Sequence, residues 1–373
     1  GKDSINNLTD ILSLFGKNVL ITYGGGSIKK IRLYDKVKSL LKDKNIYELS
    51  GIEPNPKYNP SVLDGVKICK DKKIDVVLSV GGGSVLDCSK AICAGACYDG
   101  DPWDLITYKA SVKKALPLVD IITLAATGSE YDNGAVISRT ETNDKMGFCS
   151  DLLFPYASII DPVYTFTVSP YQTAAGAIDA INHVMEAYFA EKHSTLMDGM
   201  SEACIKSIIK YTPIALKNPN DYNARAEIML SATLACNGIL SLGNSSSGWP
   251  MHAIEHALSA YFDITHGVGL GIITPRWMKY VLSDKTINRF VSFGTHVFDI
   301  DSSLSKEEIA KETICKVYDI FASFNIPMTL TEVGIKESDL KEIAHHIAIN
   351  EGLDKAWAPL NENDILNILK DCL

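Results

Sequence analysis

The stretch DVVLSVGGGSVLDCSK (residues 75–90) joins a short apolar run to a helical pattern through three glycines and a serine. A second stretch, NVLITYGGGSIKK (18–30), repeats this arrangement. Glycines let a backbone approach a ligand closely, and a helix N-terminus offers free N–H groups to a phosphate. The alternative is that these glycines only form tight turns, and neither triplet fits G-x-G-x-x-G. Because the turn occurs twice, each time after an apolar run, it favours a dinucleotide site.

The rest of the chain falls into two parts around these turns. Apolar runs that predict strands alternate with helical patterns at 18–23, 45–49, 75–80, 120–125 and 156–161, which is typical of a largely parallel, helix-covered sheet. Beyond residue 163 the pattern is helical to the end, and it starts with Ser169-Pro170, a helix N-cap followed by proline. The sequence therefore predicts an α/β domain over 1–163 and an all-helical domain over 164–373.

Composition excludes several classes of protein. A net charge of -9 and the lack of any Lys/Arg-rich run argue against a nucleic-acid partner. No apolar run reaches about 18 residues, so no membrane span and no secretion are predicted. Nine scattered cysteines without a C-x-x-C pair indicate reduced thiols in a cytoplasmic protein.

Two helical stretches carry matching polar stripes. In GAIDAINHVMEAY (176–188), Asp179, Asn182, His183 and Glu186 share one helix face, and in MHAIEHALSAYFDITHG (251–267) the stripe is His252, Glu255, His256 and Ser259, with His266 following. No Lys or Arg occurs between residues 226 and 275. Carboxylate and imidazole groups at i, i+4 spacing in such surroundings predict a metal site, and the absence of thiolates suits Fe(II) or Zn(II). The remaining histidines (193, 296, 345 and 346) are interpreted as surface or structural residues.

Two functions from different classes fit these features. His252 to His256 matches H-x-x-E-H, the signature of one group of zinc peptidases. That hypothesis leaves the glycine turns and the whole α/β half without a role. The other hypothesis places a nicotinamide dinucleotide on the α/β domain, a metal on the helical domain and the substrate between them, for hydride transfer assisted by a Lewis acid.

The order of the motifs resembles that of the iron-containing (group III) alcohol dehydrogenases, and above all their butanol dehydrogenase and broad aldehyde reductase branch. The resemblance covers nearly the whole chain and rests on LITYGGGS, EPNP (53–56), GGGSVLDCSK, ATGSE (126–130), DPVYT (161–165) and the two histidine stretches. It implies a Rossmann-like nucleotide-binding domain joined to a helical metal-binding domain, as in the dehydroquinate synthase-like fold. It also implies interconversion of short primary alcohols and aldehydes.

The resemblance assigns roles residue by residue. It implies Asp179, His183, His252 and His266 as ligands of Fe(II) or Zn(II), and His256 as a proton-relay or positioning residue. It implies cofactor contacts from Gly25, Gly26, Ser27, Asn55, Gly82, Gly83, Ser84, Asp87, Thr123, Thr127 and Lys145. For Asp87 and Lys145, the alternative interpretation is that they are ordinary surface charges. Lys145 is expected in a polar loop.

The first glycine turn also bears on the choice of cofactor. An acidic residue near such a turn normally binds the ribose 2′-hydroxyl and repels a 2′-phosphate, whereas this turn carries Ser27 and is followed by Lys29 and Lys30. NADPH is therefore preferred over NADH. Among relatives on the same two-domain plan, glycerol dehydrogenase and the lyase dehydroquinate synthase are the alternatives. A homodimer is expected, with a small alcohol or aldehyde as the substrate.

Overall fold

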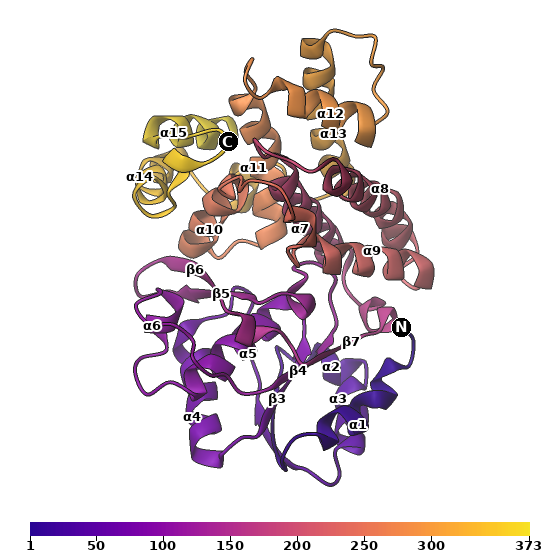
Figure 1. The fold of residues 1–373 in the computed structure, drawn as a ribbon, viewed down its shortest axis with the longest axis vertical. Coiled ribbons are helices and arrows are strands. Elements are labelled where there is room, and N and C mark those ends of the chain that lie inside the picture. Colours follow the sequence, from indigo (N-terminus) through magenta and orange to yellow (C-terminus); the bar gives the residue numbers. More distant parts are fainter. The chain divides into compact units, whose positions relative to one another are not determined.

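The computed structural model describes residues 1–373 and divides into two compact units (Figure 1). The first comprises Gly1–Val168 and Pro219–Met229, and the second comprises Ser169–Asn218 and Leu230–Leu373. The main division thus follows Val168, whereas the sequence predicts it at residue 163. The return of Pro219–Met229 to the first unit has no counterpart in the prediction, because helix α9 (Tyr222–Ala235) reads as one continuous helical pattern.

A parallel five-stranded sheet forms the centre of the first unit, as the sequence predicts. Its strands are β1 (Asn18–Thr22), β2 (Asn45–Leu49), β3 (Val76–Gly81), β4 (Leu118–Ile122) and β7 (Ala157–Ile160), in the order β2-β1-β3-β4-β7. This is a doubly wound order, in which the direction of winding reverses between β1 and β3. Ligands of such sheets bind outside the carboxyl ends of the strands at this reversal. Both glycine triplets follow the two strands concerned.

Helices cover both faces of this sheet because its strands are apolar on both sides. Val19, Ile21 and Leu78 pack with residues of α1 (Leu8–Ser13), α2 (Ser27–Lys30) and α3 (Leu33–Leu40) on one face. Leu20 and Val77 pack on the other face with residues of α4 (Leu63–Lys72) and α5 (Gly83–Ala96), and the short α6 (Trp103–Ile106) joins that cluster.

An antiparallel hairpin of β5 (Gly134–Arg139) and β6 (Asp144–Cys149) adds a second, two-stranded sheet that the sequence analysis does not predict. Lys145 lies in β6 opposite Ser138 and is 8% exposed, so its prediction as a residue of a polar loop is wrong. The error arose because the polar run ETND (141–144) continues directly into the strand. Asp87 is 9% exposed, so neither residue is a surface charge.

The second unit is entirely helical, as predicted. Its helices, besides the end of α9, are α7 (Pro170–Tyr188), α8 (Thr195–Lys217), α10 (Pro250–Phe262), α11 (His266–Val281), α12 (Ile287–Val297), α13 (Lys306–Ser323), α14 (Leu340–Asn350) and α15 (Glu362–Asp371). Helix α7 packs against α8 and α11 and is buried from Thr173 to Tyr188, and the Ser169 hydroxyl caps its first turn by accepting from the Gln172 N–H. The polar stripe of α7 is therefore buried and not exposed to solvent.

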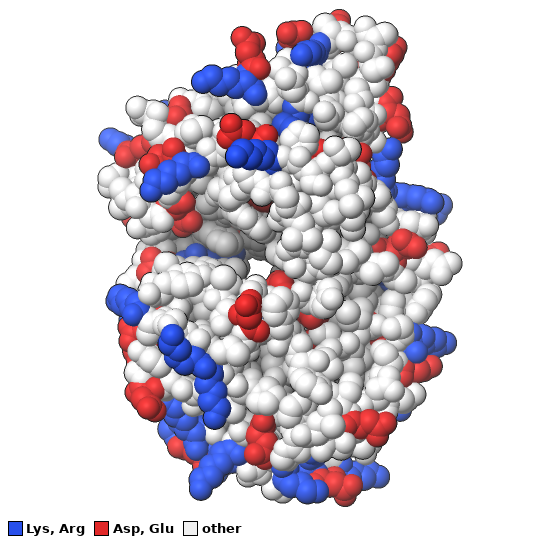
Figure 2. Space-filling model, in the orientation of Figure 1, with Lys and Arg blue, Asp and Glu red and all other residues white.

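Three further predictions concern the chain as a whole. All nine cysteines are free thiols, as predicted. None of the helices combines the length and the apolar character that crossing a bilayer requires. On the face drawn in Figure 2, basic and acidic residues are interspersed, and no concentrated basic surface is visible there.

Candidate functional site

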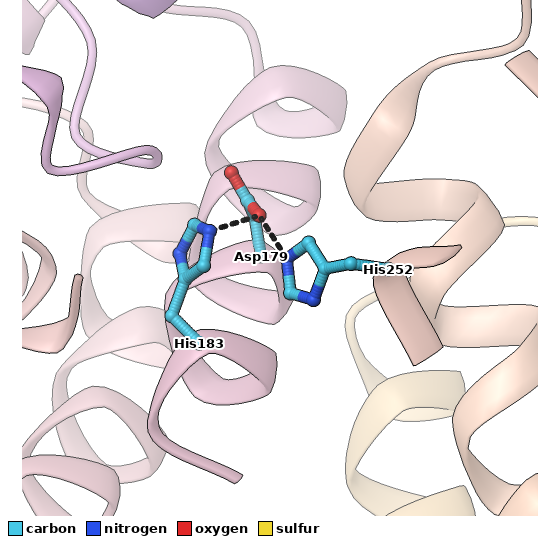
Figure 3. Close-up of side chains that lie close together, drawn as sticks. All are labelled: Asp179, His183 and His252. Carbon is cyan, nitrogen blue, oxygen red and sulfur yellow. Dashed lines mark ion pairs between the residues drawn. The ribbon is translucent and has the colours of Figure 1, made fainter. Parts of the chain in front are cut away.

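Four predicted metal ligands lie together within the second unit. Asp179 and His183 come from successive turns of α7, His252 comes from α10, and His266 is the first residue of α11. Oδ1 of Asp179 lies 3.6 Å from Nε2 of His183, 3.8 Å from Nε2 of His252 and 3.5 Å from Nε2 of His266. Figure 3 shows the imidazoles of His183 and His252 directed at that carboxylate. Packing of three helices thus places three imidazole nitrogens around one oxygen.

These separations fit a metal ion better than hydrogen bonds. Ligand atoms that bind one tetrahedral ion at about 2.1 Å lie roughly 3.4 Å apart, close to the three distances observed. Oδ1 of Asp179 and Nε2 of His252 are buried and make no hydrogen bond. Burial of a polar atom without a partner is costly, and a divalent cation would satisfy both atoms at once. The residues present therefore fit an Fe(II) or Zn(II) ion.

The charge states of the ligands support the same interpretation. Burial raises the pKa of the Asp179 carboxyl, but the imidazoles of His183, His266 and His252 outweigh it and hold that pKa well below its usual range. Burial lowers the pKa of His183 to about 4, which leaves a neutral ring with a free lone pair. Burial alone would also lower the pKa of His252, yet Asp179 and Glu186 raise it to about 9. A metal ion must therefore displace a proton from His252.

Glu186 orients His252 and holds the start of its helix. Its Oε1 lies 3.2 Å from Nδ1 of His252 and accepts the N–H groups of Met251 and His252 at 3.0 and 3.1 Å. A carboxylate that holds the second nitrogen of a ligating imidazole fixes the tautomer and the orientation of the ring. The other residue left in the stripe, Asn182, bonds the Ile178 carbonyl and the Thr274 hydroxyl. Both residues thus hold the helices that carry the predicted ligands.

Glu255 supports His266 in the same way. Its carboxylate contacts Nδ1 of His266 through one oxygen and the Ser259 hydroxyl through the other, and it is fully buried. Glu255, His256 and His266 form a second group whose ligand atoms lie within 4.8 Å of one another. The peptidase hypothesis requires Glu255 to activate water, but its two oxygens already bind His266 and Ser259. That hypothesis is therefore disfavoured.

His256 lies beside the ligands and is half-buried. Its ring centroid is 5.5 Å from that of His266 and 6.1 Å from that of His252. The other four histidines lie elsewhere, in ion pairs with carboxylates or, for His346, beside Asn350. Their interpretation as surface or structural residues agrees with this placement.

The predicted cofactor residues gather at the carboxyl edge of the first unit's sheet. Gly25, Gly26 and Ser27 follow β1, Gly82 to Ser84 begin α5 after β3, and Thr123 and Thr127 lie in the loop after β4. A Cβ on Gly83 would lie 2.4 Å from Oγ1 of Thr127, so this glycine lets the loop approach the helix. A Cβ on Gly25 would meet nothing within 4 Å, so packing does not explain this glycine.

Two polar residues stabilise the loop and hairpin beside these turns. Asp87 accepts the Ser129 hydroxyl at 2.7 Å and the Val136 N–H at 2.9 Å. Lys90, fully buried, donates to the carbonyls of Ser129 and Gly134 at 2.8 Å and pairs with Asp132 at 2.6 Å. Lys90 is not among the predicted site residues, although a lone charge in the apolar run CSKAICAGAC (88–97) is a sign of a buried partner. Asn55 lies in the loop after β2 and is buried, and its contact with a nucleotide stays a prediction.

Comparison with known proteins gives consistent matches along the whole chain. Residues 1–162 match the family model described as iron-containing alcohol dehydrogenase, and residues 173–373 match the C-terminal model of the Fe-containing alcohol dehydrogenase family. The chain is 46% identical to NADH-dependent butanol dehydrogenase A of Clostridium acetobutylicum over 374 residues, covering 99% of this chain and 96% of that protein.

Two further relatives extend this picture. NADPH-dependent aldehyde reductase YqhD of Escherichia coli is 36% identical, with 93% of this chain and 90% of that protein covered. The crystal structure of NADH-dependent butanol dehydrogenase A from Thermotoga maritima superposes with a TM-score of 0.95 at 38% identity, covering 100% of this chain and 95% of that one. With both family models matched and full-length relatives well above 30% identity, the chain belongs to the iron-containing alcohol dehydrogenase family.

Proposed function

We propose that this protein is an NAD(P)H-linked oxidoreductase that interconverts short primary aldehydes and alcohols at a divalent-metal centre. The observation that carries the proposal is the set of three buried residues, Asp179, His183 and His252, with the partly buried His266 beside them. The same chain bears two glycine turns at the winding reversal of a parallel sheet. The names of its relatives, butanol dehydrogenase and aldehyde reductase, support the substrate class.

The proposal gives each group of residues a role. The four ligands would hold Fe(II) or Zn(II), which as a Lewis acid polarises a carbonyl oxygen. Glu186 and Glu255 keep two of the imidazoles oriented. The turns at Gly25–Ser27 and Gly82–Ser84 would receive the pyrophosphate, because Gly25 and Ser27 are exposed and the second turn begins the long helix α5. His256, half-buried beside the ligands, would hold or pass on the proton that the alkoxide product needs.

A direct assay tests this proposal. Metal-free protein is loaded with Fe(II) or Zn(II) and mixed with butanal and NADH or NADPH, and nicotinamide absorbance is followed. We expect cofactor oxidation only when metal, aldehyde and cofactor are all present. Absence of oxidation with every short aldehyde contradicts the proposal, and preferential oxidation of glycerol would point to a polyol dehydrogenase instead.

The proposal includes NADPH as the preferred cofactor. It rests on the first glycine turn, which carries no carboxylate and is followed by two lysines. The names of the relatives point both ways, since those at 46% and 45% identity are NADH-dependent and that at 36% is NADPH-dependent. The ratio of kcat/KM for the two cofactors measures the preference directly. The expected homodimer stays a prediction, which light scattering of the full chain measures.

A further inference from the structure

Trp249 adopts an unusual backbone conformation directly before the helix that carries His252. Its φ and ψ are 52° and 47°, in the left-handed region, where a bulky residue is rare. Such a conformation persists only where surrounding contacts impose it, and residues of this kind cluster at functional sites.

Trp249 is held in this conformation through Ser247 and Glu186, and Glu186 is also the residue that orients His252. Ser247 Oγ accepts the Trp249 N–H at 3.0 Å and donates to Oε2 of Glu186 at 3.1 Å. The Ser247 carbonyl accepts the Trp357 N–H at 2.8 Å. Glu186 thus connects the strained turn to the metal ligand.

The indole lies against two of the predicted ligands and is still partly open to solvent. Its centroid is 5.0 Å from the His252 ring and 5.9 Å from the His183 ring. The Trp249 residue is 39% exposed, whereas His183 and His252 are buried. Trp249 thus combines solvent exposure with ring contacts to two of the predicted ligands, and its indole is flat, largely apolar and rigid.

We propose that the Trp249 indole forms one wall of the space that receives the aldehyde and selects short unbranched chains over branched ones. The inference rests on the proposed function. A flat ring packs along an extended alkyl chain, but it collides with a branch next to the carbonyl carbon. Trp249 is therefore a specificity-determining residue and not a catalytic one.

Three variants distinguish the effect of the Trp249 ring from the effect of its strained backbone. W249F keeps a smaller ring, and W249G removes the ring while occupying the left-handed region without strain. Y280A is the matched control, because Tyr280 is 40% exposed in the same unit and bonds Asp364 near the end of α11. Each protein is loaded with the same metal, and kcat and KM are measured for butanal and for 2-ethylbutanal. Circular dichroism and bound metal are measured in parallel.

In W249G we expect KM for butanal to rise about tenfold with little change in kcat, because an apolar wall contributes mainly to binding. We expect kcat/KM for 2-ethylbutanal to rise, so that the ratio of the two substrates shifts by more than about tenfold. W249F should lie between W249G and wild type, and Y280A should match wild type. If Trp249 had only a structural role, W249G would lower kcat/KM for both substrates by the same factor. An unchanged ratio of the two kcat/KM values in W249G, with metal retained, therefore overturns the inference.

A second measurement does not depend on activity. Co(II) quenches nearby indoles, so titrating Co(II) into the metal-free protein should quench a component of tryptophan fluorescence that W249F lacks. Equal quenching in W249F and wild type places the indole away from the centre and also overturns the inference. If wild type reduces no aldehyde, the proposed function fails, and the fluorescence result still decides the position of Trp249.

Discussion

His252 is the residue on which the metal centre can be tested most directly, since its Nε2 is buried without a hydrogen bond. We expect H252A to lower metal affinity by more than about 100-fold, because outer partners of a ligand alone contribute about 10–100-fold. Activity should fall together with metal content. Metal analysis after dialysis measures the first effect and the butanal assay the second.

His345 provides the matched control for H252A. Its side chain is 61% exposed and pairs with Glu362 at 2.9 Å, on helices that carry none of the predicted ligands. H345A should keep its metal and its rate. If H252A also keeps both, the assignment of the ligands is wrong.

Asp87 makes stability depend on pH through a buried carboxyl. Burial raises its pKa to about 6, although Lys90 counteracts the effect. Because this folded pKa exceeds the unfolded value of 3.8, the folded chain binds more protons between these values, and its stability falls as pH rises. The stabilisation is complete below about pH 4 and lost above about pH 6. Its size is about 3 kcal/mol.

The variant D87N imitates the protonated carboxyl, since its amide can donate to Ser129 and accept the Val136 N–H. Relative to D87N, wild type should lose up to about 3 kcal/mol of unfolding free energy between pH 4 and pH 7. Urea denaturation of both proteins across this range measures the difference. A difference that grows in the opposite direction would show that the folded carboxyl has a lowered pKa.

At the scale of elements, the start of α5 depends on close approach of the loop after β4. G83A would place a Cβ 2.4 Å from Oγ1 and 3.0 Å from Cβ of Thr127, so the loop must move. Since Thr127 is branched at Cβ, rotation alone cannot relieve the contact. We expect affinity for the nicotinamide cofactor to fall at least about tenfold, because small displacements in a binding site are costly.

The control for G83A is a helical glycine that has no close neighbours. Gly199 lies in α8, and a Cβ there would meet nothing within 4 Å. G199A should leave cofactor affinity unchanged and stabilise the chain by roughly 0.5–1 kcal/mol through helix propensity. Fluorescence titration with NADH and NADPH compares the two variants. If G83A and G199A bind the cofactor with equal affinity, the α5 turn is not part of the cofactor site.

At the scale of the whole molecule, the metal should stabilise the second unit, because its ligands come from α7, α10 and α11 and are not assembled in the unfolded chain. At a free metal concentration of 100 times Kd, binding adds about 2.7 kcal/mol, or roughly 5–10 °C in Tm. Calorimetry of the full chain with and without chelator measures this shift. No shift in wild type, or an equal shift in H252A, would contradict the site.

Much of the architecture could be predicted because it depends on local pattern. The five parallel strands follow apolar runs bounded by turn residues, and α7 follows its N-cap and its helical spacing. The β5–β6 hairpin could not be predicted, because its strands are partly polar and β6 begins inside the polar run ETND (141–144). Membership of Pro219–Met229 in the first unit also depends on contacts distant in sequence.

The sequence by itself determined the pairs that a single helix brings together, Asp179 with His183 and His252 with Glu255 and His256, since their spacing puts them on one face. Only the tertiary structure decided that the three imidazoles of His183, His252 and His266 meet at one oxygen of Asp179, because this requires the packing of three helices. It also decided the burial of Lys90 and the strained position of Trp249. Lys90 donates to the Ser129 carbonyl, 39 residues further along the chain, and the Ser247 hydroxyl that accepts from Trp249 itself donates to Glu186, 61 residues earlier. Spacing along one helix does not predict contacts between segments so far apart.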